Sequence, residues 1–223
     1  MTIELQFIVG TVLGSFLSLV SLRIFRHESI IRPASHCDHC QHQLQPWEMI
    51  PVVSFLILRG KCSHCRQPIG WVTFIGEVAG GVITTSNSLN LTGSLETGFE
   101  LLLLFAALCD CRTRSVPDWT LLSLLTLALI QRIFIGDLNP VIFLIVISTY
   151  LVITALNHHC RFIGNGDVDL MFILLIKTNL NSLIFITLIS SGMAILKYVI
   201  THQSRLIPYF PYLSLAYFLL FHL

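Results

Sequence analysis

The chain has 223 residues, of which 54% are hydrophobic and 11% are charged. Soluble domains carry about 25% charged residues, so this composition excludes an ordinary soluble protein. The net charge of +1 gives no support to a nucleic-acid partner, because proteins that bind nucleic acids present a basic field.

Apolar windows along the chain predict an all-α membrane protein with about eight transmembrane helices. The first window follows no positively charged segment, and its first charge is Glu4. We therefore expect a retained span there and not a signal peptide. The predicted spans cover residues 5–22, 71–91, 98–109, 119–135, 141–157, 168–180, 182–200 and 209–223.

The basic residues predict how these spans are oriented, since Lys and Arg gather in cytoplasmic loops. If both termini lie outside, Arg132 and Lys177 are the two of the 13 basic residues that fall on the outer side. We therefore expect a multi-pass protein of the plasma membrane, with the lipid bilayer around most of the chain. Glu100, near the outer end of the third span, is expected to be solvated.

Residues 23–70, which we call the Cys module, form the longest stretch between predicted spans and concentrate charge, His and Cys. We expect this module to lie in the cytoplasm, between a first span at residues 1–22 and a transmembrane core at residues 71–223. It contains two Cys-x-x-Cys pairs, a duplicated spacing typical of structural zinc sites. Unligated cysteines or a redox pair are the alternative. The predicted zinc ligands are Cys37, Cys40, Cys62 and Cys65.

Two aspartates at predicted membrane boundaries are the candidate catalytic residues. Asp110 closes the third span and Asp167 opens the sixth, and the predicted topology puts both on the cytoplasmic side. Two carboxyl groups that share a site hold one proton between them, so one can activate water while the other acts as an acid. Gly164 and Gly166 would let the backbone approach a substrate strand closely. The alternative for each Asp is a helix cap or a solvated carboxylate, which fits Asp118 well.

Five motifs, in chain order, resemble those of the prepilin leader peptidase family. Relative to that family, Ser18 replaces the usual Asn, Asp38 replaces a frequent Pro, and Asp169 replaces a common Lys. The motifs are Gly14-Ser-Phe-Leu-Ser with Arg23, the paired Cys loop, Asp110-Cys-Arg through Val116-Pro-Asp, Gly164-Asn-Gly-Asp-Val, and Ile207-Pro-Tyr-Phe-Pro-Tyr-Leu.

This resemblance implies a membrane aspartyl endopeptidase with Asp110 and Asp167 as its catalytic pair. Its substrates would be single-span type IV prepilins or pseudopilins, whose basic leader is removed at the cytoplasmic membrane face. The compact chain favours the competence-pseudopilin branch. Many members also methylate the new N-terminus with S-adenosylmethionine as methyl donor. The Cys loop is associated with that second activity, so the intact four-Cys pattern predicts a bifunctional enzyme. Glu77 matches a family glutamate and is a candidate for methyl transfer, or otherwise a buried carboxyl group satisfied by a neighbouring helix.

Two other classes of function are compatible with the residue chemistry. In a proton-coupled membrane transporter with a cytoplasmic zinc module, Asp110, Asp167 and Glu77 would relay protons, but such sites usually lie at broken helices near the midplane. A non-enzymatic zinc scaffold would leave both Asp motifs unexplained. The position of the two aspartates at helix ends on one side favours the peptidase.

Overall fold

The computed structural model describes residues 2–136, 140–160, 164–201 and 207–222. Within these ranges the chain is helical apart from its turns and two isolated β-bridges in the Cys module. The helices are α1 (Ile3–Phe25), the 3₁₀ helix η1 (Pro46–Met49), α2 (Val53–Ile57), α3 (Trp71–Ser86), α4 (Leu91–Thr113), α5 (Asp118–Ile135), α6 (Pro140–Cys160), α7 (Asn165–Lys177), α8 (Leu180–Thr201) and α9 (Phe210–His222).

A helix stands at each of the eight predicted apolar windows, so the all-α prediction is confirmed. Among the described residues, three helices are both long enough and apolar enough to cross a membrane, namely α1, α4 and α8. Two shorter apolar helices cover Phe143–Asn157 and Phe210–His222. The number of spans is therefore supported only in part.

The predicted boundaries were wrong around the second and third spans. Helix α3 ends at Ser86, and α4 begins at Leu91, because the side chain of Asn90 accepts a hydrogen bond from the N–H of Gly93 and caps the helix. The first two turns of α4 are polar, so a search for apolar windows placed its start at residue 98.

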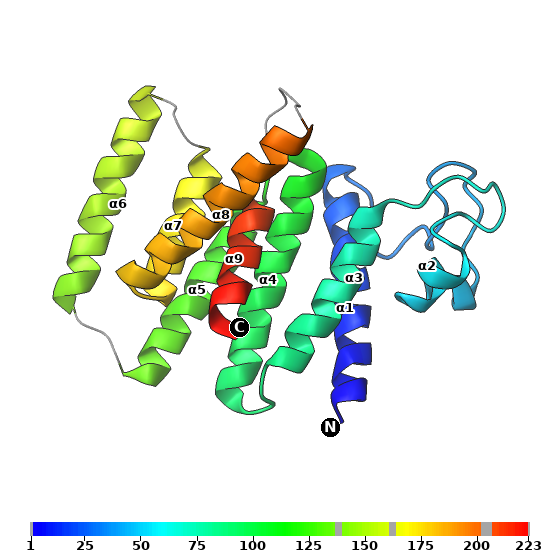
Figure 1. The fold of residues 1–223 in the computed structure, drawn as a ribbon, viewed down its shortest axis with the longest axis horizontal. Coiled ribbons are helices and arrows are strands. Elements are labelled where there is room, and N and C mark those ends of the chain that lie inside the picture. Colours follow the sequence, from blue (N-terminus) through cyan, green and yellow to red (C-terminus); the bar gives the residue numbers. More distant parts are fainter. Residues whose placement is uncertain (1, 137–139, 161–163, 202–206, 223) are drawn as a thin grey trace.

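The helices stand side by side in an extended row, with α6 at one end and the Cys module at the other (Figure 1). Helices α4, α5, α7 and α9 share the main core, where Phe99, Leu124, Leu170 and Leu213 are buried. Helix α9 packs against α4, and α7 packs against α5, so the C-terminal end of α4 and the N-terminal ends of α7 and α9 lie at the same end of the molecule, near the top of Figure 1.

Helices α1 and α3 pack backbone against backbone. A Cβ added at Gly14 would lie 2.2 Å from the carbonyl oxygen of Gly76, and one at Gly80 would lie 2.4 Å from that of Gly10. Small residues four apart allow this close approach in membrane helices. The contact holds the face of α3 that carries Glu77 against α1.

Candidate active site

Asp110 lies in the last turn of α4 and is buried, with 7% of its surface exposed. The backbone N–H of Phe210, the first residue of α9, donates a hydrogen bond of 3.1 Å to its Oδ2 atom. Because this N–H belongs to the first turn of a helix, it has no partner within α9 and is free to bind a carboxylate. The start of α9 therefore orients Asp110.

Asp167 lies in the first turn of α7 and is partly exposed. Its backbone N–H donates to the carbonyl oxygen of Gly164, which is the N-cap of the helix. The Asp167 carboxyl group interacts electrostatically with Asp110, although 56 residues separate the two in sequence. The fold therefore brings both candidate catalytic residues to one site.

The two glycines of the motif leave room for the side chains around Asp167. A Cβ at Gly164 would lie 3.0 Å from Oδ2 of Asp167, which is closer than ordinary contact. A Cβ at Gly166 would lie 3.5 Å from the ring of Phe210, which is ordinary van der Waals contact. The ring of Phe210 thus covers the start of α7 while its N–H holds Asp110. Sequence reasoning assigned no role to Phe210, although it lies within the fifth motif.

The neighbouring acids take no part in this site. The hydroxyl group of Tyr150 on α6 donates a hydrogen bond of 2.8 Å to Asp169, which lies on a different side of α7 from Asp167. Asp118 is exposed in the first turn of α5, where Pro117 occupies the cap position. The interpretation of Asp118 as the cap residue itself was wrong by one position.

Arg112 connects the end of α4 to α1 and α3 by hydrogen bonds. Its guanidinium group donates to the carbonyl oxygen of Ser18 on α1 at 2.9 Å and to the hydroxyl group of Thr73 on α3 at 3.1 Å. A partly buried cation with these two acceptors fixes the last turn of α4, which also carries Asp110. The sequence motif contained Arg112, but its partners could only be found in the folded chain.

Glu77 lies in the second turn of α3 and is buried, with 7% of its surface exposed. Its two carboxyl oxygens accept hydrogen bonds from the hydroxyl group of Ser15 on α1 at 2.8 Å and from the backbone N–H of Val52 at 2.7 Å. Val52 has a φ angle of +63°, which is costly for a β-branched residue. Glu77 therefore joins α1, α3 and a strained turn of the Cys module.

The four predicted metal ligands lie together. The Sγ atoms of Cys37, Cys40, Cys62 and Cys65 are all within 4.8 Å of one another, and those of Cys37 and Cys65 are 3.8 Å apart. Tetrahedral zinc with Zn–S bonds of about 2.3 Å separates its sulfurs by about 3.8 Å, so the cluster fits this ion. The backbone N–H groups of Cys65 and His64 lie against the Cys62 thiol and lower its pKa to about 7. Such donors favour the thiolate form that binds metal.

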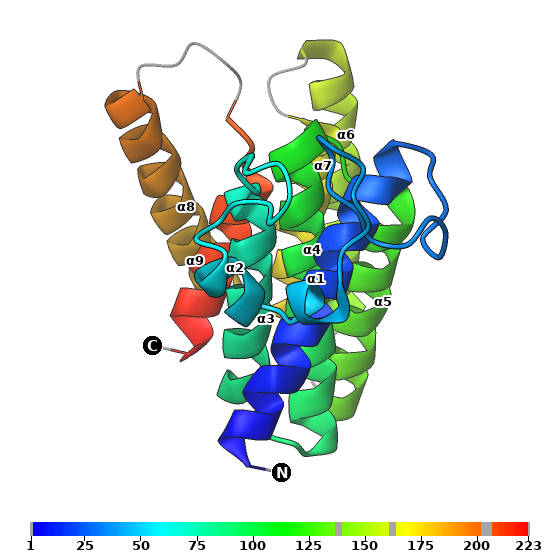
Figure 2. The same cartoon turned by 90° about the vertical axis from the view of Figure 1, so that its right-hand side faces the viewer.

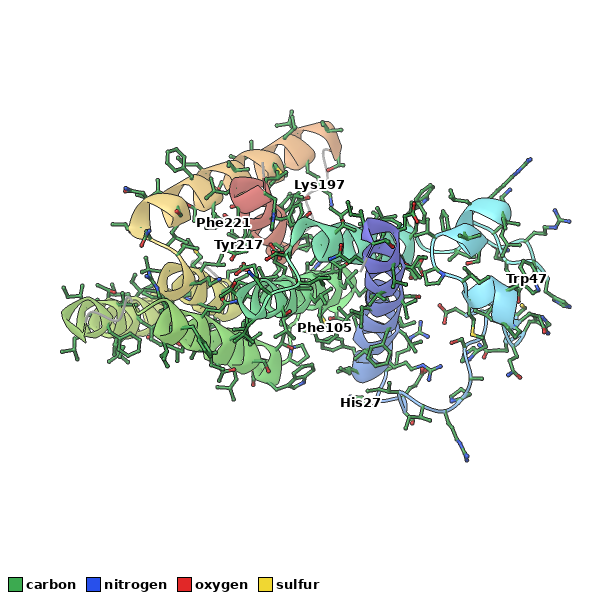
Figure 3. The ribbon with its side chains drawn as sticks, turned by 90° about the horizontal axis from the view of Figure 1, so that it is seen from below. His27, Trp47, Phe105, Lys197, Tyr217 and Phe221 are labelled. Atoms are coloured by element: carbon green, nitrogen blue, oxygen red, sulfur yellow. The ribbon has the colours of Figure 1, made fainter. Side chains whose placement is uncertain are left out.

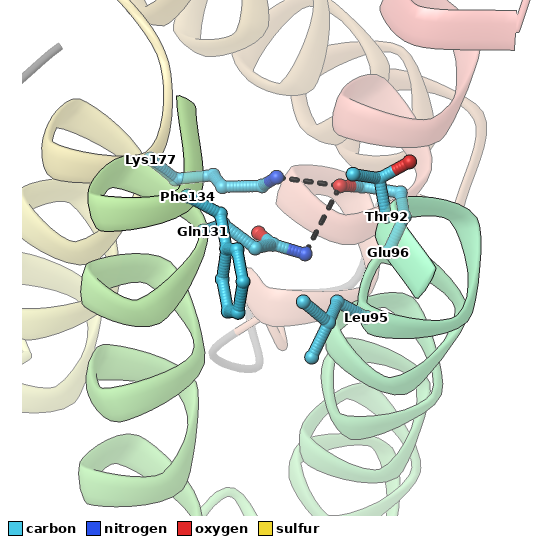
Figure 4. A pocket seen from close by; sticks show the side chains of 6 residues that line it. All are labelled: Thr92, Leu95, Glu96, Gln131, Phe134 and Lys177. Atoms are coloured by element: carbon cyan, nitrogen blue, oxygen red, sulfur yellow. Dashed lines mark hydrogen bonds and ion pairs between the residues drawn. The ribbon is translucent and has the colours of Figure 1, made fainter. Parts of the chain in front are cut away.

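A second polar cluster lies at the opposite end of α4, roughly 21 Å from Asp110 along the helix. Glu96 accepts hydrogen bonds from Lys177 and Tyr217, each at 2.5 Å, and from Gln131 at 3.3 Å. Figure 4 shows Glu96, Lys177 and Gln131 at a pocket of about 60 Å³. The cluster is too far from the aspartates to share their chemistry.

The expectation that Glu100 is solvated was wrong. Its exposed fraction is 3%, and its carboxyl group binds His222 at 2.6 Å and Asn87 at 2.7 Å. Partners from α9 and from the turn after α3 satisfy this buried acid. His222 is 122 residues away from Glu100 in the chain, so no local sequence pattern indicates their contact.

Comparisons with known proteins find similarity over most of the chain. The model of the bacterial peptidase A24 N-terminal domain matches residues 8–91, and that of the type IV leader peptidase family matches residues 99–200. No solved structure matches the chain.

Several curated proteins named prepilin leader peptidase/N-methyltransferase are similar to this chain. The protein from Bacillus subtilis is 29% identical over 186 residues, which cover 77% of this chain and 72% of that protein. The protein from Burkholderia pseudomallei is 34% identical over 154 residues, which cover 62% of this chain and 48% of that protein. The protein from Pseudomonas aeruginosa is 36% identical over 110 residues, which cover 48% and 38% respectively. The chain thus matches about half or less of the length of the last two.

Proposed function

Because the chain belongs to the type IV leader peptidase family, we propose that it is a membrane aspartyl endopeptidase with Asp110 and Asp167 as its catalytic residues. Its substrates are single-span type IV prepilins or pseudopilins, whose basic leader peptide it removes. The observation that carries this proposal is that Phe210 at the start of α9 binds Asp110 on α4 and lies beside Gly166 on α7, so that the carboxyl groups of Asp110 and Asp167 are close enough to interact electrostatically.

The pair of carboxyl groups supplies both an acid and a base. One ionised Asp takes a proton from water, whose oxygen forms a bond to the carbonyl carbon of the scissile peptide. The other, protonated Asp donates its proton to the carbonyl oxygen. When the C–N bond breaks, the amine takes the proton that the first Asp removed from water. As the C=O bond re-forms, one hydroxyl group of the intermediate returns its proton to the second Asp, so both carboxyl groups regain their starting states. The hydrogen bond from Phe210 keeps the Asp110 carboxyl group in place through these steps.

The glycines at the start of α7 give this site its access. Gly164 and Gly166 carry no side chains beside Asp167, so an extended substrate segment can approach the backbone closely. A peptide bond must leave its helix before it can be attacked, and backbone that lines a wet site tolerates this unwinding at the membrane boundary. This supports cleavage where the leader meets the transmembrane helix of the substrate.

The Cys module would bind one structural zinc ion through Cys37, Cys40, Cys62 and Cys65. The ion would supply folding free energy to a segment that buries few apolar side chains of its own. With four thiolate ligands it has no open position, so it takes no part in the hydrolysis.

A second activity is supported by the names of the relatives, which include N-methyltransferase. In this activity the new N-terminal amine would receive a methyl group from S-adenosylmethionine. Glu77 is our candidate for a role in it, because it joins the Cys module to the helices. Since both of its oxygens already accept hydrogen bonds, we assign Glu77 to positioning the module and not to proton transfer.

For the membrane topology we propose eight spans in the plasma membrane, a first span at residues 1–22, a cytoplasmic Cys module at residues 23–70 and a peptidase core at residues 71–223. The catalytic pair then lies on the cytoplasmic side. Two basic residues lie on the outer side in this topology, and both have partners: Lys177 binds Glu96, and Arg132 binds the carbonyl oxygen of Ile176. Such pairing lowers the free-energy cost of placing a cation near the outer side of the membrane. The proton-coupled transporter finds no support in the family models or the relatives.

The test is cleavage of a co-expressed prepilin whose leader ends in Gly. Asp110→Asn and Asp167→Asn should each lower the cleavage rate by about 100-fold to 10,000-fold while the protein still inserts. Asp118→Asn is the matched control and should cleave normally. Full processing by both catalytic-site variants would reject the assignment. Mass measurement of the product also reports methylation, as the added mass of one methylene group.

A further inference from the structure

The segment Pro46–Ile57 of the Cys module has an inverted pattern of burial. Its one charged side chain, Glu48, is buried and binds the backbone N–H of Gln45 at 2.7 Å. Phe55 packs inward, but six other large apolar side chains of the segment point outward, each with between 47% and 66% of its surface exposed. They are Trp47, Met49, Ile50, Val53, Leu56 and Ile57. Water would favour the reverse arrangement, so another environment is expected to cover this surface.

The level of this segment along the helices identifies that environment. Glu77, which accepts the hydrogen bond from Val52, lies roughly 9 Å along α3 from the start of that helix. Ser15, which donates to the same carboxyl group, lies roughly 15 Å before the end of α1. Helix α1 has 23 residues and is about as long as the hydrocarbon core is thick. Figures 1 and 2 show α2 beside the middle of the α1–α3 pair and not beyond its ends.

The apolar surface of the segment continues the lipid-facing surface of α3. The ring of Phe55 stacks on Phe74 and meets Trp71 edge-on, which docks α2 on the first turn of α3. Trp71 and Ile75 on α3 are themselves exposed by 65% and 58%. Figure 3 places Trp47 on the outer edge of the Cys module, away from α1.

The backbone and the flanking charges also suit lipid. In a bilayer every backbone N–H group needs a hydrogen-bond partner. The Glu77 carboxyl group accepts the hydrogen bond from the N–H of Val52, and the two prolines of the segment have no N–H group. The residues that follow include Arg59, Lys61 and Arg66, all exposed. Their charge complements anionic headgroups.

We propose that Pro46–Ile57 inserts its apolar side into the bilayer leaflet nearest the Cys module and anchors the module beside α3. The Cys module is then only partly surrounded by water. Apolar segments of this kind lie about 5–10 Å below the headgroups, with Trp near the boundary. The anchor holds the zinc cluster at a fixed place next to the membrane. The inference does not depend on the peptidase activity.

Tryptophan fluorescence of the full-length protein in vesicles of phosphatidylcholine and phosphatidylglycerol tests the anchor. The difference in emission between the parent protein and Trp47→Phe gives the emission of Trp47 alone, without that of the other two Trp residues. We expect lipids brominated on their acyl chains to quench this difference strongly and iodide to quench it weakly. In the Trp47→Phe background, emission added by Ile57→Trp should follow the lipid quencher, whereas emission added by Arg66→Trp should follow iodide.

Strong iodide quenching at positions 47 and 57, with no effect of brominated lipid, would overturn the proposal. Iodide quenching that disappears when a prepilin is added would also overturn it, since the surface would then be a docking site for substrate. A thermal unfolding transition equal to that of the parent establishes that each variant is folded.

Discussion

The backbone N–H of Phe210 binds Oδ2 of Asp110 at 3.1 Å, and the ring of the same residue covers the start of α7 beside Asp167. One residue of α9 therefore binds Asp110 and lies beside Gly166, the residue before Asp167. Helix α9 thus lines the candidate site together with α4 and α7.

This contact predicts that cleavage depends on the backbone of residue 210 more than on its side chain. Phe210→Pro removes the N–H at the first helical position, where proline is tolerated, and should lower the rate about 10-fold to 100-fold, as expected for a hydrogen bond to a charged group. Phe210→Leu keeps the N–H and should lower it less. Rates of leader cleavage by the purified variants decide this. Equal losses in the two variants would assign the effect to the ring.

The two glycines of the α7 motif should differ in their sensitivity to substitution. Gly164→Ala places a Cβ 3.0 Å from the Asp167 carboxylate and must displace it, whereas Gly166→Ala makes an ordinary contact of 3.5 Å with Phe210. Gly164 has a φ angle of −59°, which Ala adopts without strain. We therefore expect Gly164→Ala to lose cleavage while keeping thermal stability, and Gly166→Ala to lose less. A greater loss of cleavage in Gly166→Ala would contradict this account.

The sequence predicted where the helices form but not which of them touch. Eight apolar windows mark eight helices, and the pairing of Cys37 and Cys40 with Cys62 and Cys65 follows from their spacing. The polar first turns of α4 were not predicted as helix, because a hydropathy window counts apolar residues and takes no account of the hydrogen-bond partners of polar ones. Glu96 and Glu100 are tolerated there because Lys177, Tyr217 and His222 arrive from α7 and α9. Contacts of such long range, including that of Phe210 with Asp110, leave no periodic pattern.

Loss of one thiolate should release the metal of the Cys module. Cys62→Ser should remove bound zinc and lower the thermal stability of the module, because structural zinc binding contributes to the free energy of folding. Cys111→Ser is the control, since Cys111 is a free and exposed cysteine outside the cluster. Metal content of the purified proteins is the measurement. Unchanged zinc in Cys62→Ser would reject the four-thiolate site.

The partly buried pair of Glu96 and Lys177 predicts a non-additive effect on stability. Their N–O distance is 2.5 Å, and their side chains are 22% and 10% exposed. Removing one partner of a fully buried pair costs about 3–5 kcal/mol, and a partly buried pair should lose less, because water reaches the charge that is left without compensation. Glu96→Gln and Lys177→Met should therefore each destabilise the protein in detergent, and the double variant should be more stable than the sum of the two losses implies. Leader cleavage by the folded fraction should stay unchanged, since the pair lies at the far end of α4 from Asp110. Strictly additive losses would show that the two charges do not depend on each other, and that the polar neighbours Tyr217 and Gln131 are sufficient to hold Glu96.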